Sequence, residues 1–237
     1  MQEEYNQAVA EHYAAYRPPL HKIILGKLIP SGQQFEAGLD IGCGTGYSSI
    51  ALSNYCDHVT GIDPSSSMID QAIQHPSISY LQGDENRLTE LRPESIDVVT
   101  FAGSLYYAKN DKLYHELQRL LKPRGQLLIY DFQVILDNAL QQLDLAPTSV
   151  ESDYQYIVDL TDWKQFKSEV SQTEQISLPL SPEQLSHILL ADSNIYSLIA
   201  GKLGYEGLYP KVVSYFKDLA KEHPLIVTLY YSRVLKD

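Results

Sequence analysis

The stretch Leu39-Asp40-Ile41-Gly42-Cys43-Gly44-Thr45-Gly46-Tyr47 places three glycines at alternate positions, directly after an apolar run that begins at Phe35. A short apolar run of this kind is typical of a buried β-strand. Alternate glycines allow the chain to turn sharply into a helix, and they let the backbone approach a ligand closely. The stretch therefore predicts a buried strand, a tight turn and a helix, with a ligand bound at the turn.

Two residues of this stretch narrow the class of ligand. The glycine-rich fingerprint of dinucleotide-binding proteins has a small residue at the position that Tyr47 occupies here. Asp40, two residues before Gly42, places a carboxylate at the end of the strand. Because a carboxylate attracts an ammonium group and repels a pyrophosphate, the stretch favours a ligand with an ammonium group over a dinucleotide.

Strands and helices are expected to alternate through the first 131 residues. Hydrophobic periodicity predicts strands at 35–41, 59–63, 78–82, 96–101 and 126–131, and helices at 47–55, 65–74 and 111–121. Such alternation is typical of parallel strands joined by right-handed helical crossovers. Sheets of this type bind ligands beyond the carboxyl ends of their strands, at the point where the strand order reverses.

The segments on either side have a less regular pattern. Two helices are expected at 6–16 and 20–28, separated by Pro18 and Pro19. After residue 131 the pattern predicts a helix at 133–145, a strand at 167–176, helices at 181–190 and 211–222, and a final strand at 225–234. Residues 154–166 give no clear prediction.

The segment Leu39–Gly46 resembles the first motif of the class I S-adenosylmethionine-dependent methyltransferases, of the type that acts on small molecules. Further segments resemble later motifs of that family in the same order. These are Gly61–Ser65 with Met68 downstream, Gly83–Glu85, Ser95–Thr100 and Leu121–Leu127. The resemblance covers roughly residues 35 to 131.

The resemblance implies an α/β fold with a doubly wound, mostly parallel, seven-stranded sheet, the Rossmann-like methyltransferase fold, with an antiparallel last strand and a mainly helical cap. It also implies S-adenosyl-L-methionine as the cofactor. Asp63 would hold the ribose, since a carboxylate is a natural acceptor for two neighbouring hydroxyls, and Asp84 would meet the adenine amino group. The cofactor-binding residues implied are Asp40, Gly42, Cys43, Gly44, Gly46, Asp63, Pro64, Met68, Asp84, Glu85, Phe101 and Ala102.

The resemblance also indicates where a methyl acceptor would bind. The segment Tyr13–Pro19 resembles a lead-in helix that folds over the methionine end of the cofactor. We therefore expect a core of residues 1–132 and 210–237, in which residues 1–28 form a lid, and a substrate-side cap of residues 133–209. Tyr13 and Tyr106 are the candidate catalytic residues, although Tyr106, like Tyr107, is equally suited to packing. By position alone, His12 and Asp131 are further candidate bases, and Arg17 is a candidate partner for a substrate carboxylate.

Composition excludes several other classes of protein. The net charge is −12 and no basic stripe is present, which disfavours a nucleic-acid substrate. No apolar run approaches the ~20 residues of a membrane span, and the chain begins without the pattern of a signal peptide. With only Cys43 and Cys56, and no metal-ligand spacing among seven histidines, we expect a cytoplasmic protein without a catalytic metal, as a monomer or homodimer.

The sequence thus predicts an enzyme that transfers a methyl group from S-adenosylmethionine to a small-molecule acceptor, at oxygen, nitrogen or carbon, with a carboxylic acid as one candidate. Two alternatives stay open. A nicotinamide-dependent oxidoreductase also uses a glycine-rich turn and an acid at Asp63. A non-catalytic module that binds S-adenosylmethionine would share the same turn.

Overall fold

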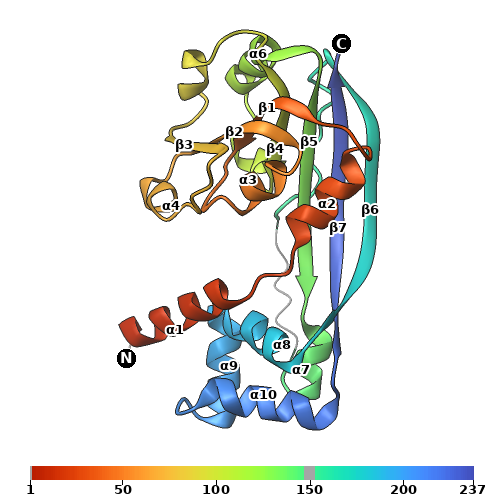
Figure 1. Ribbon diagram of the computed structural model, residues 1–237. Helices are drawn as coiled ribbons and strands as arrows, with labels where there is room; N and C mark the ends of the chain where they lie inside the picture. Colours follow the sequence, from red (N-terminus) through yellow and green to blue (C-terminus); the bar gives the residue numbers. More distant parts are fainter. Residues whose placement is uncertain (1, 147–152) are drawn as a thin grey trace. The chain divides into compact units, whose positions relative to one another are not determined.

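The computed structural model describes residues 2–146 and 153–237, with side chains from residue 7 onward. Its strands form one seven-stranded sheet in the order β3-β2-β1-β4-β5-β7-β6 (Figure 1). They are β1 (Phe35–Ile41), β2 (Cys56–Asp63), β3 (Ile78–Gln82), β4 (Ile96–Ala102), β5 (Leu121–Ile135), β6 (Phe166–Leu180) and β7 (His223–Lys236). The predicted α/β fold with seven strands is confirmed.

The chain divides into two compact units. We call Pro19–Phe132, Asp153–Glu174 and Leu229–Asp237 the sheet unit, and Met1–Pro18, Gln133–Ser152 and Gln175–Thr228 the helical unit. The chain passes between the units inside β5, β6 and β7, so their bounds differ from the expected core of 1–132 and 210–237 and cap of 133–209. Residues 147–152 of the expected cap lie outside the described residues.

The first five strands of the sheet unit are parallel. β1 lies between β2 and β4, with Gly38 opposite both Val59 and Val98. β3 extends the sheet beyond β2, and β5 extends it beyond β4. The chain order therefore reverses beside β1, and the carboxyl ends of β1 and β4 meet where folds of this type bind ligands.

β7 runs antiparallel to both of its neighbours. The backbone N–H of Asp237, directly after β7, donates to the carbonyl of Gln165, directly before β6 (3.0 Å). The Nζ of Lys236 donates to the carbonyl of Leu121, where β5 begins (2.7 Å). The end of β7 thus lies beside the beginnings of β5 and β6, which confirms the predicted antiparallel last strand.

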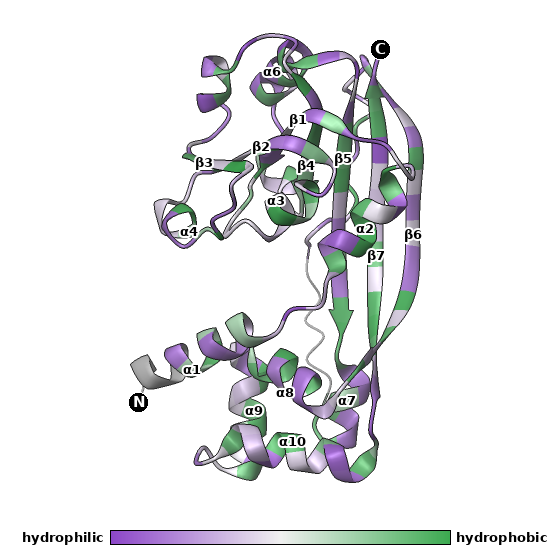
Figure 2. Cartoon of the chain, in the orientation of Figure 1, coloured by the Kyte–Doolittle hydropathy of each residue, from purple (hydrophilic) through white to green (hydrophobic). Residues whose placement is uncertain are grey.

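A continuous apolar core stabilises the sheet unit. Helix α6 (Asp111–Leu120) buries Leu113, Leu117 and Leu120 at helical spacing against strand residues such as Val99 and Leu127. Full burial of each such side chain contributes about 1.5–3 kcal/mol. Figure 2 shows this hydrophobic character along β4 and β5. The remaining helices of this unit are α2 (Leu20–Leu28), α3 (Tyr47–Leu52), α4 (Ser66–Asp70), the short 3-10 helix η1 (Arg87–Glu90) and α5 (Leu105–Ala108).

β5 is longer at both ends than the predicted strand 126–131. Pro123 and Gly125 suggest a turn in the sequence, but the structure accommodates them inside the strand through a register shift, with Arg124 at φ 63°. At the other end, the β-branched residues Val134 and Ile135 continue the strand. The prediction of a helix over 133–145 is therefore wrong for its first residues, and the helix α7 spans only Asp137–Gln142.

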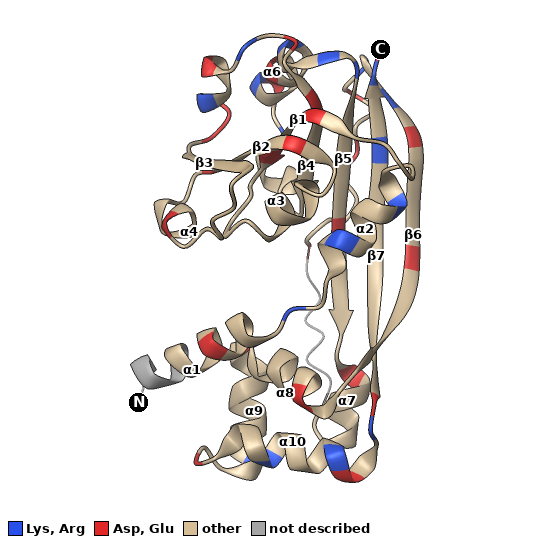
Figure 3. Cartoon of the chain, in the orientation of Figure 1, with Lys and Arg blue, Asp and Glu red and all other residues tan. Residues whose placement is uncertain are grey.

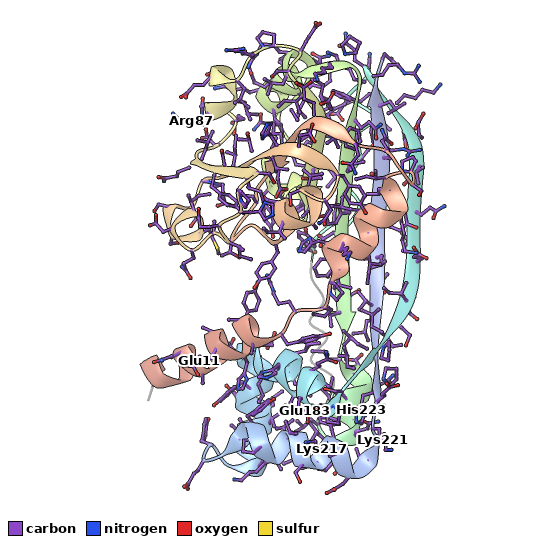
Figure 4. The ribbon with its side chains drawn as sticks, viewed as in Figure 1. Glu11, Arg87, Glu183, Lys217, Lys221 and His223 are labelled. Carbon is purple, nitrogen blue, oxygen red and sulfur yellow. The ribbon has the colours of Figure 1, made fainter. Side chains whose placement is uncertain are left out.

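The helical unit contains α1 (Gln2–Ala15), α7, α8 (Pro182–Leu190), α9 (Ser193–Leu203) and α10 (Leu208–Leu219). Ser181 and Gln184 form a capping box at the start of α8. Figure 4 labels Glu183 on α8 and Lys217 on α10, which form an ion pair at 2.7 Å. α9 was not predicted, although Asp192 caps it by accepting from the backbone N–H groups of Asn194 and Ile195.

The charges of the described residues are dispersed over both units. Figure 3 shows acidic and basic residues scattered along the elements, without a basic stripe. None of the described helices is long and apolar enough to cross a membrane.

Candidate cofactor site

The turn after β1 depends on backbone that only glycine adopts readily. Gly42, Gly44 and Gly46 have φ values of 72°, 53° and 90°, in the left-handed region that disfavours residues with a Cβ. A Cβ on Gly42 would collide with Ser104, and one on Gly46 would collide with the ring of Tyr80. Close packing at two of the three positions thus fixes this turn.

Most N–H groups of the turn bond within the protein. Those of Gly42 and Cys43 donate to the carbonyl of Ile62 (2.8 and 3.1 Å), and that of Gly46 donates to the carbonyl of Cys43 (2.9 Å). The N–H of Gly44 donates to Oδ2 of Asp63 (2.9 Å). Phosphate-binding glycine loops point such N–H groups at the ligand, so this turn lacks the donors that a pyrophosphate requires.

Asp40 lies beneath the turn, fully buried. Its Oδ2 accepts hydrogen bonds from the hydroxyls of Ser48 and Ser49 (2.6 Å each), and its Oδ1 accepts one from Thr100 (2.7 Å). Burial raises the pKa of Asp40, and the three hydroxyl donors oppose that rise. The sequence suggests a direct contact between Asp40 and an ammonium group, but here the carboxylate joins β1, α3 and β4 below the ligand site.

Asp63, the last residue of β2, lies at the surface of the site. Besides the bond from Gly44, its Oδ1 accepts from the backbone N–H of Ser65 (2.9 Å). The side chain is half-buried. Each carboxylate oxygen therefore keeps lone-pair capacity for a ligand, because a carboxylate accepts about four hydrogen bonds.

A cavity of about 400 Å³ opens at the carboxyl ends of these strands. Apolar side chains form part of its wall: Ile41, Ile62, Leu88 and Leu113. Three carboxylates, those of Asp63, Asp84 and Glu85, also lie on the wall, together with the backbone of Gly42 and Gly103. Among the described residues, no Lys or Arg lines this cavity.

The two acids after β3 are held by neighbouring amides. Oδ1 of Asp84 accepts from the backbone N–H of Asn86 (2.9 Å), and Oε1 of Glu85 accepts from Nδ2 of Asn110 (3.2 Å). The bonds from Asn86 hold the pKa of Asp84 below its ordinary value. Both residues line the cavity, and each side chain already accepts a hydrogen bond from an asparagine.

The other residues expected at the cofactor divide into two groups. Pro64 and Ala102 line the cavity with Asp63, Asp84, Glu85 and Gly42. Cys43, Phe101, Gly44, Gly46 and Met68 are not among its lining residues. Cys43 and Phe101 are buried, and Met68 is exposed on α4. Burial raises the pKa of the Cys43 thiol, as expected for a packing residue rather than a nucleophile.

Several residues of the site were missed in the sequence. The hydroxyl of Ser104 donates to the carbonyl of Ile41 (2.5 Å) and joins the loop after β4 to the end of β1. The hydroxyls of Ser48, Ser49 and Thr100 surround Asp40. Serine directly after the glycines was the available signal, but the sequence does not show that these hydroxyls point back at β1.

The candidate catalytic residues lie in different units. Tyr106, on α5 of the sheet unit, is exposed and packs edge-on against Tyr154, with ring centroids 4.9 Å apart. Tyr13 and His12, on α1 of the helical unit, lie near other side chains of that unit. Arg17 stacks over the ring of Tyr13 at 3.7 Å, and His12 contacts His187. No group of three or more side chains suited to a metal ion occurs in the described part of the chain.

The cavity suits S-adenosylmethionine better than a dinucleotide. An apolar slot is suited to an adenine ring, and a carboxylate such as that of Asp63 is suited to accept hydrogen bonds from a vicinal diol. Three acidic side chains and occupied turn N–H groups are unfavourable for a pyrophosphate. The site therefore fits a nucleoside that carries positive charge and no phosphate.

Comparison with known proteins agrees with this geometry. The model of a family described as a methyltransferase domain matches residues 39–129. A probable S-adenosylmethionine-dependent methyltransferase of Saccharomyces cerevisiae is 28% identical over 122 residues, covering 48% of this chain and 42% of the relative. A ubiquinone biosynthesis O-methyltransferase of Pseudomonas aeruginosa is 32% identical over 97 residues, covering 38% of this chain and 42% of the relative. The matches span less than half the length of both relatives.

A solved structure extends the likeness to nearly the whole chain. The protein described as a "Putative Type II Methyltransferase" from Anaeromyxobacter dehalogenans superimposes with a TM-score of 0.61 at 22% identity, covering 93% of this chain and 97% of that one. At this identity the likeness concerns the fold. The matching family model thus shows that residues 39–129 form a methyltransferase domain, and the solved structure shows that the likeness in fold extends over nearly the whole chain.

Proposed function

We propose that this protein transfers the methyl group of S-adenosylmethionine to a small organic acceptor. The observation that carries the proposal is the cavity itself, in which the Asp63 carboxylate and an apolar slot lie beside a glycine turn most of whose N–H groups are already bonded. This combination supports a nucleoside ligand without phosphate. The dispersed charge and the acidic lining support a small acceptor over a nucleic acid.

Each lining group has a proposed task. Asp63 binds the ribose, Asp84 and Glu85 face the adenine, and Gly42 with Gly103 lets the backbone approach the rest of the ligand. Asp40 positions this backbone from below through its three hydroxyl partners. When bound, S-adenosylmethionine supplies a methyl group on a positively charged sulfur, which is already activated for displacement. The protein must then align the acceptor and exclude water.

The acceptor side rests on the family resemblance. Residues 1–28 are proposed to cover the site, with Tyr13 and Tyr106 near the acceptor. A hydroxyl, an amine, a carbon nucleophile and a carboxylic acid are all compatible with the reaction class, because this fold does not determine the acceptor atom. Arg17 is the group that would pair with an acidic acceptor.

Two measurements test the proposal. Calorimetric titration with S-adenosylhomocysteine, in parallel with NAD, should show binding of the nucleoside thioether only. Binding of NAD alone, or of neither ligand, would refute the assignment. Labelled S-adenosylmethionine, offered with a panel of small acceptors, should give labelled product. Tight binding without transfer to any acceptor would instead indicate a non-catalytic binding module.

A further inference from the structure

A half-buried carboxylate lies next to the cofactor cavity on the side away from Asp63. Asp131 is near the end of the β5 segment in the sheet unit, and β5 neighbours β4 rather than β2. Gly103, which lines the cavity, is so close that a Cβ built on it would lie 3.4 Å from both oxygens of Asp131. The ribose-binding position and Asp131 are thus on opposite sides of β1 and β4.

A tyrosine outside the predicted site holds this carboxylate. The hydroxyl of Tyr154 lies 2.5 Å from Oδ2 of Asp131 and 3.1 Å from the carbonyl oxygen of Gly103. Oδ1 of Asp131 accepts from the backbone N–H of Phe132 (2.7 Å). A phenol has a single proton to donate, so it can serve only one of these two acceptors. One added proton on Asp131 would complete the chain from carboxyl to phenol to carbonyl.

Aromatic rings pack around Tyr154. Tyr106 packs on Tyr154 at 4.9 Å between centroids, Tyr156 does so at 5.0 Å, and Tyr107 lies 5.2 Å from Tyr106. The faces of such rings carry negative potential and attract cations. No ion pair involves Asp131 within the described residues. The net charge of −12 also favours a cation.

We propose that the methyl acceptor is an amine, which enters as an ammonium ion and pairs with Asp131 among these tyrosines. The inference rests on the proposed methyl transfer and specifies its substrate class. In the reaction, the ammonium gives one proton to the Asp131 carboxylate, and the nitrogen lone pair then forms the N–C bond while the C–S bond breaks. Sulfur keeps the bonding electrons as a neutral thioether. The methylated nitrogen carries the positive charge, and the proton on Asp131 passes to solvent.

Burial favours the proton transfer from the ammonium group to Asp131, because burial raises the pKa of this carboxyl above its ordinary value. The hydrogen bond from Tyr154 opposes that rise. The phenol of Tyr154 contacts Asp131 directly, the phenols of Tyr106, Tyr107 and Tyr156 pack on the Tyr154 ring, and Tyr130 is the neighbour of Asp131 on β5. Phenols do not ionise in acid solution. Because the carboxylates of Asp63, Asp84 and Glu85 line the cavity, a pH dependence below neutrality is assigned to Asp131 only where Asp131→Asn removes it.

The experiment compares ligands that differ in one functional group. Protein saturated with S-adenosylhomocysteine is titrated, by ligand-observed NMR, with phenethylamine, phenethyl alcohol and phenylacetate, and then with butylamine, butanol and butyrate. The amine of each set should bind about tenfold more tightly than its alcohol or acid. Asp131→Asn should remove this preference without changing the affinity for S-adenosylhomocysteine. Asp57→Asn, the same charge change at the exposed amino-terminal end of β2, should have no effect.

Tyr154→Phe tests the positioning role of the phenol. Loss of its hydrogen bond should raise the pKa of Asp131, so the pH below which amine binding is lost should move upward. A purely structural role would weaken binding equally at every pH. Equal or tighter binding of the acids, an unchanged preference in Asp131→Asn, or no binding by any member would overturn the amine assignment. Because the affinity for S-adenosylhomocysteine is measured first, these results differ from a failure of the proposed function itself.

Discussion

Replacement of Asp63 by alanine separates ligand binding from folding at this site. The carboxylate already accepts two backbone hydrogen bonds, from Gly44 and Ser65. It would accept two more from the ribose hydroxyls. A hydrogen bond to a charged group contributes about 1.5–3 kcal/mol, and the lower value applies here because Asp63 is half-buried. Two lost ribose bonds then amount to about 3 kcal/mol, or roughly a 100-fold rise in the Kd for S-adenosylhomocysteine.

The cost in stability should be smaller than the cost in binding. The N–H groups of Gly44 and Ser65 lie in half-buried turns, where water replaces part of each lost bond, so we expect about 1–2 kcal/mol of destabilisation. Asp63→Asn keeps one acceptor oxygen and should give an intermediate Kd. Asp57→Asn, a matched charge change on the same strand, should leave Kd unchanged. Calorimetry gives the affinities and urea unfolding gives the stabilities. A folded Asp63→Ala variant whose Kd stays within about threefold of the parent would refute this reasoning.

Three further predictions follow from other residues. Gly42→Ala should destabilise the protein by about 2 kcal/mol or more and abolish binding of S-adenosylhomocysteine, because it adds a collision with Ser104 to the strain of a positive φ. Gly32 also has a positive φ, but a Cβ there would face open space. Urea unfolding of Gly32→Ala should therefore show the cost of the backbone strain alone. Burial lowers the pKa of His12 and His187, and the charge of His187 lowers that of His12 further, so their contribution to stability is complete above pH ~6.5 and is lost as the pH falls. The hydrogen-exchange protection factors of α1 should therefore decrease in acid, and His187→Gln should flatten that dependence. Tyr13→Ala should slow single-turnover methyl transfer more than it changes cofactor affinity, and equal effects on both would contradict a role at the acceptor.

The order of the elements in the sheet unit was predictable because it depends on local signals. The bounds of β1, β3 and α2 match the prediction, since each lies between residues that stop regular structure, such as Pro19, Gly42 and Gly83. The bounds of β5 were predicted wrongly, because Pro123 and Gly125 suggest an end of regular structure at a place where the strand continues. Its bulge at Arg124 and its continuation through Ile135 depend on pairing with other strands, which a local pattern does not contain.

The candidate site was predictable only for the residues that lie directly after a strand of the parallel sheet. The glycine turn, Asp63, Asp84 and Glu85 lie at strand ends, and parallel strands bring their carboxyl ends together. The pair of Asp131 and Tyr154 joins residues 23 positions apart. Tyr154 lies in a segment without periodicity, so no sequence signal connects its hydroxyl with Asp131.

We predict that Asp40 acts on the ligand through the backbone that it positions and not by direct contact. Its carboxylate is fully buried and holds hydroxyls from α3 and β4, so it determines how β1, the turn and β4 are arranged around the cavity. Asp40→Asn keeps the shape but offers one acceptor oxygen and a donor group to three hydroxyls. At least one hydroxyl then lacks its acceptor, and an unsatisfied buried group costs about 1–3 kcal/mol. Stability and cofactor affinity should therefore fall together in Asp40→Asn, whereas in Asp63→Ala affinity falls further than stability. An Asp40→Asn variant with normal stability and sharply weakened binding of S-adenosylhomocysteine would instead mean that the Asp40 carboxylate reaches the ligand's ammonium group directly.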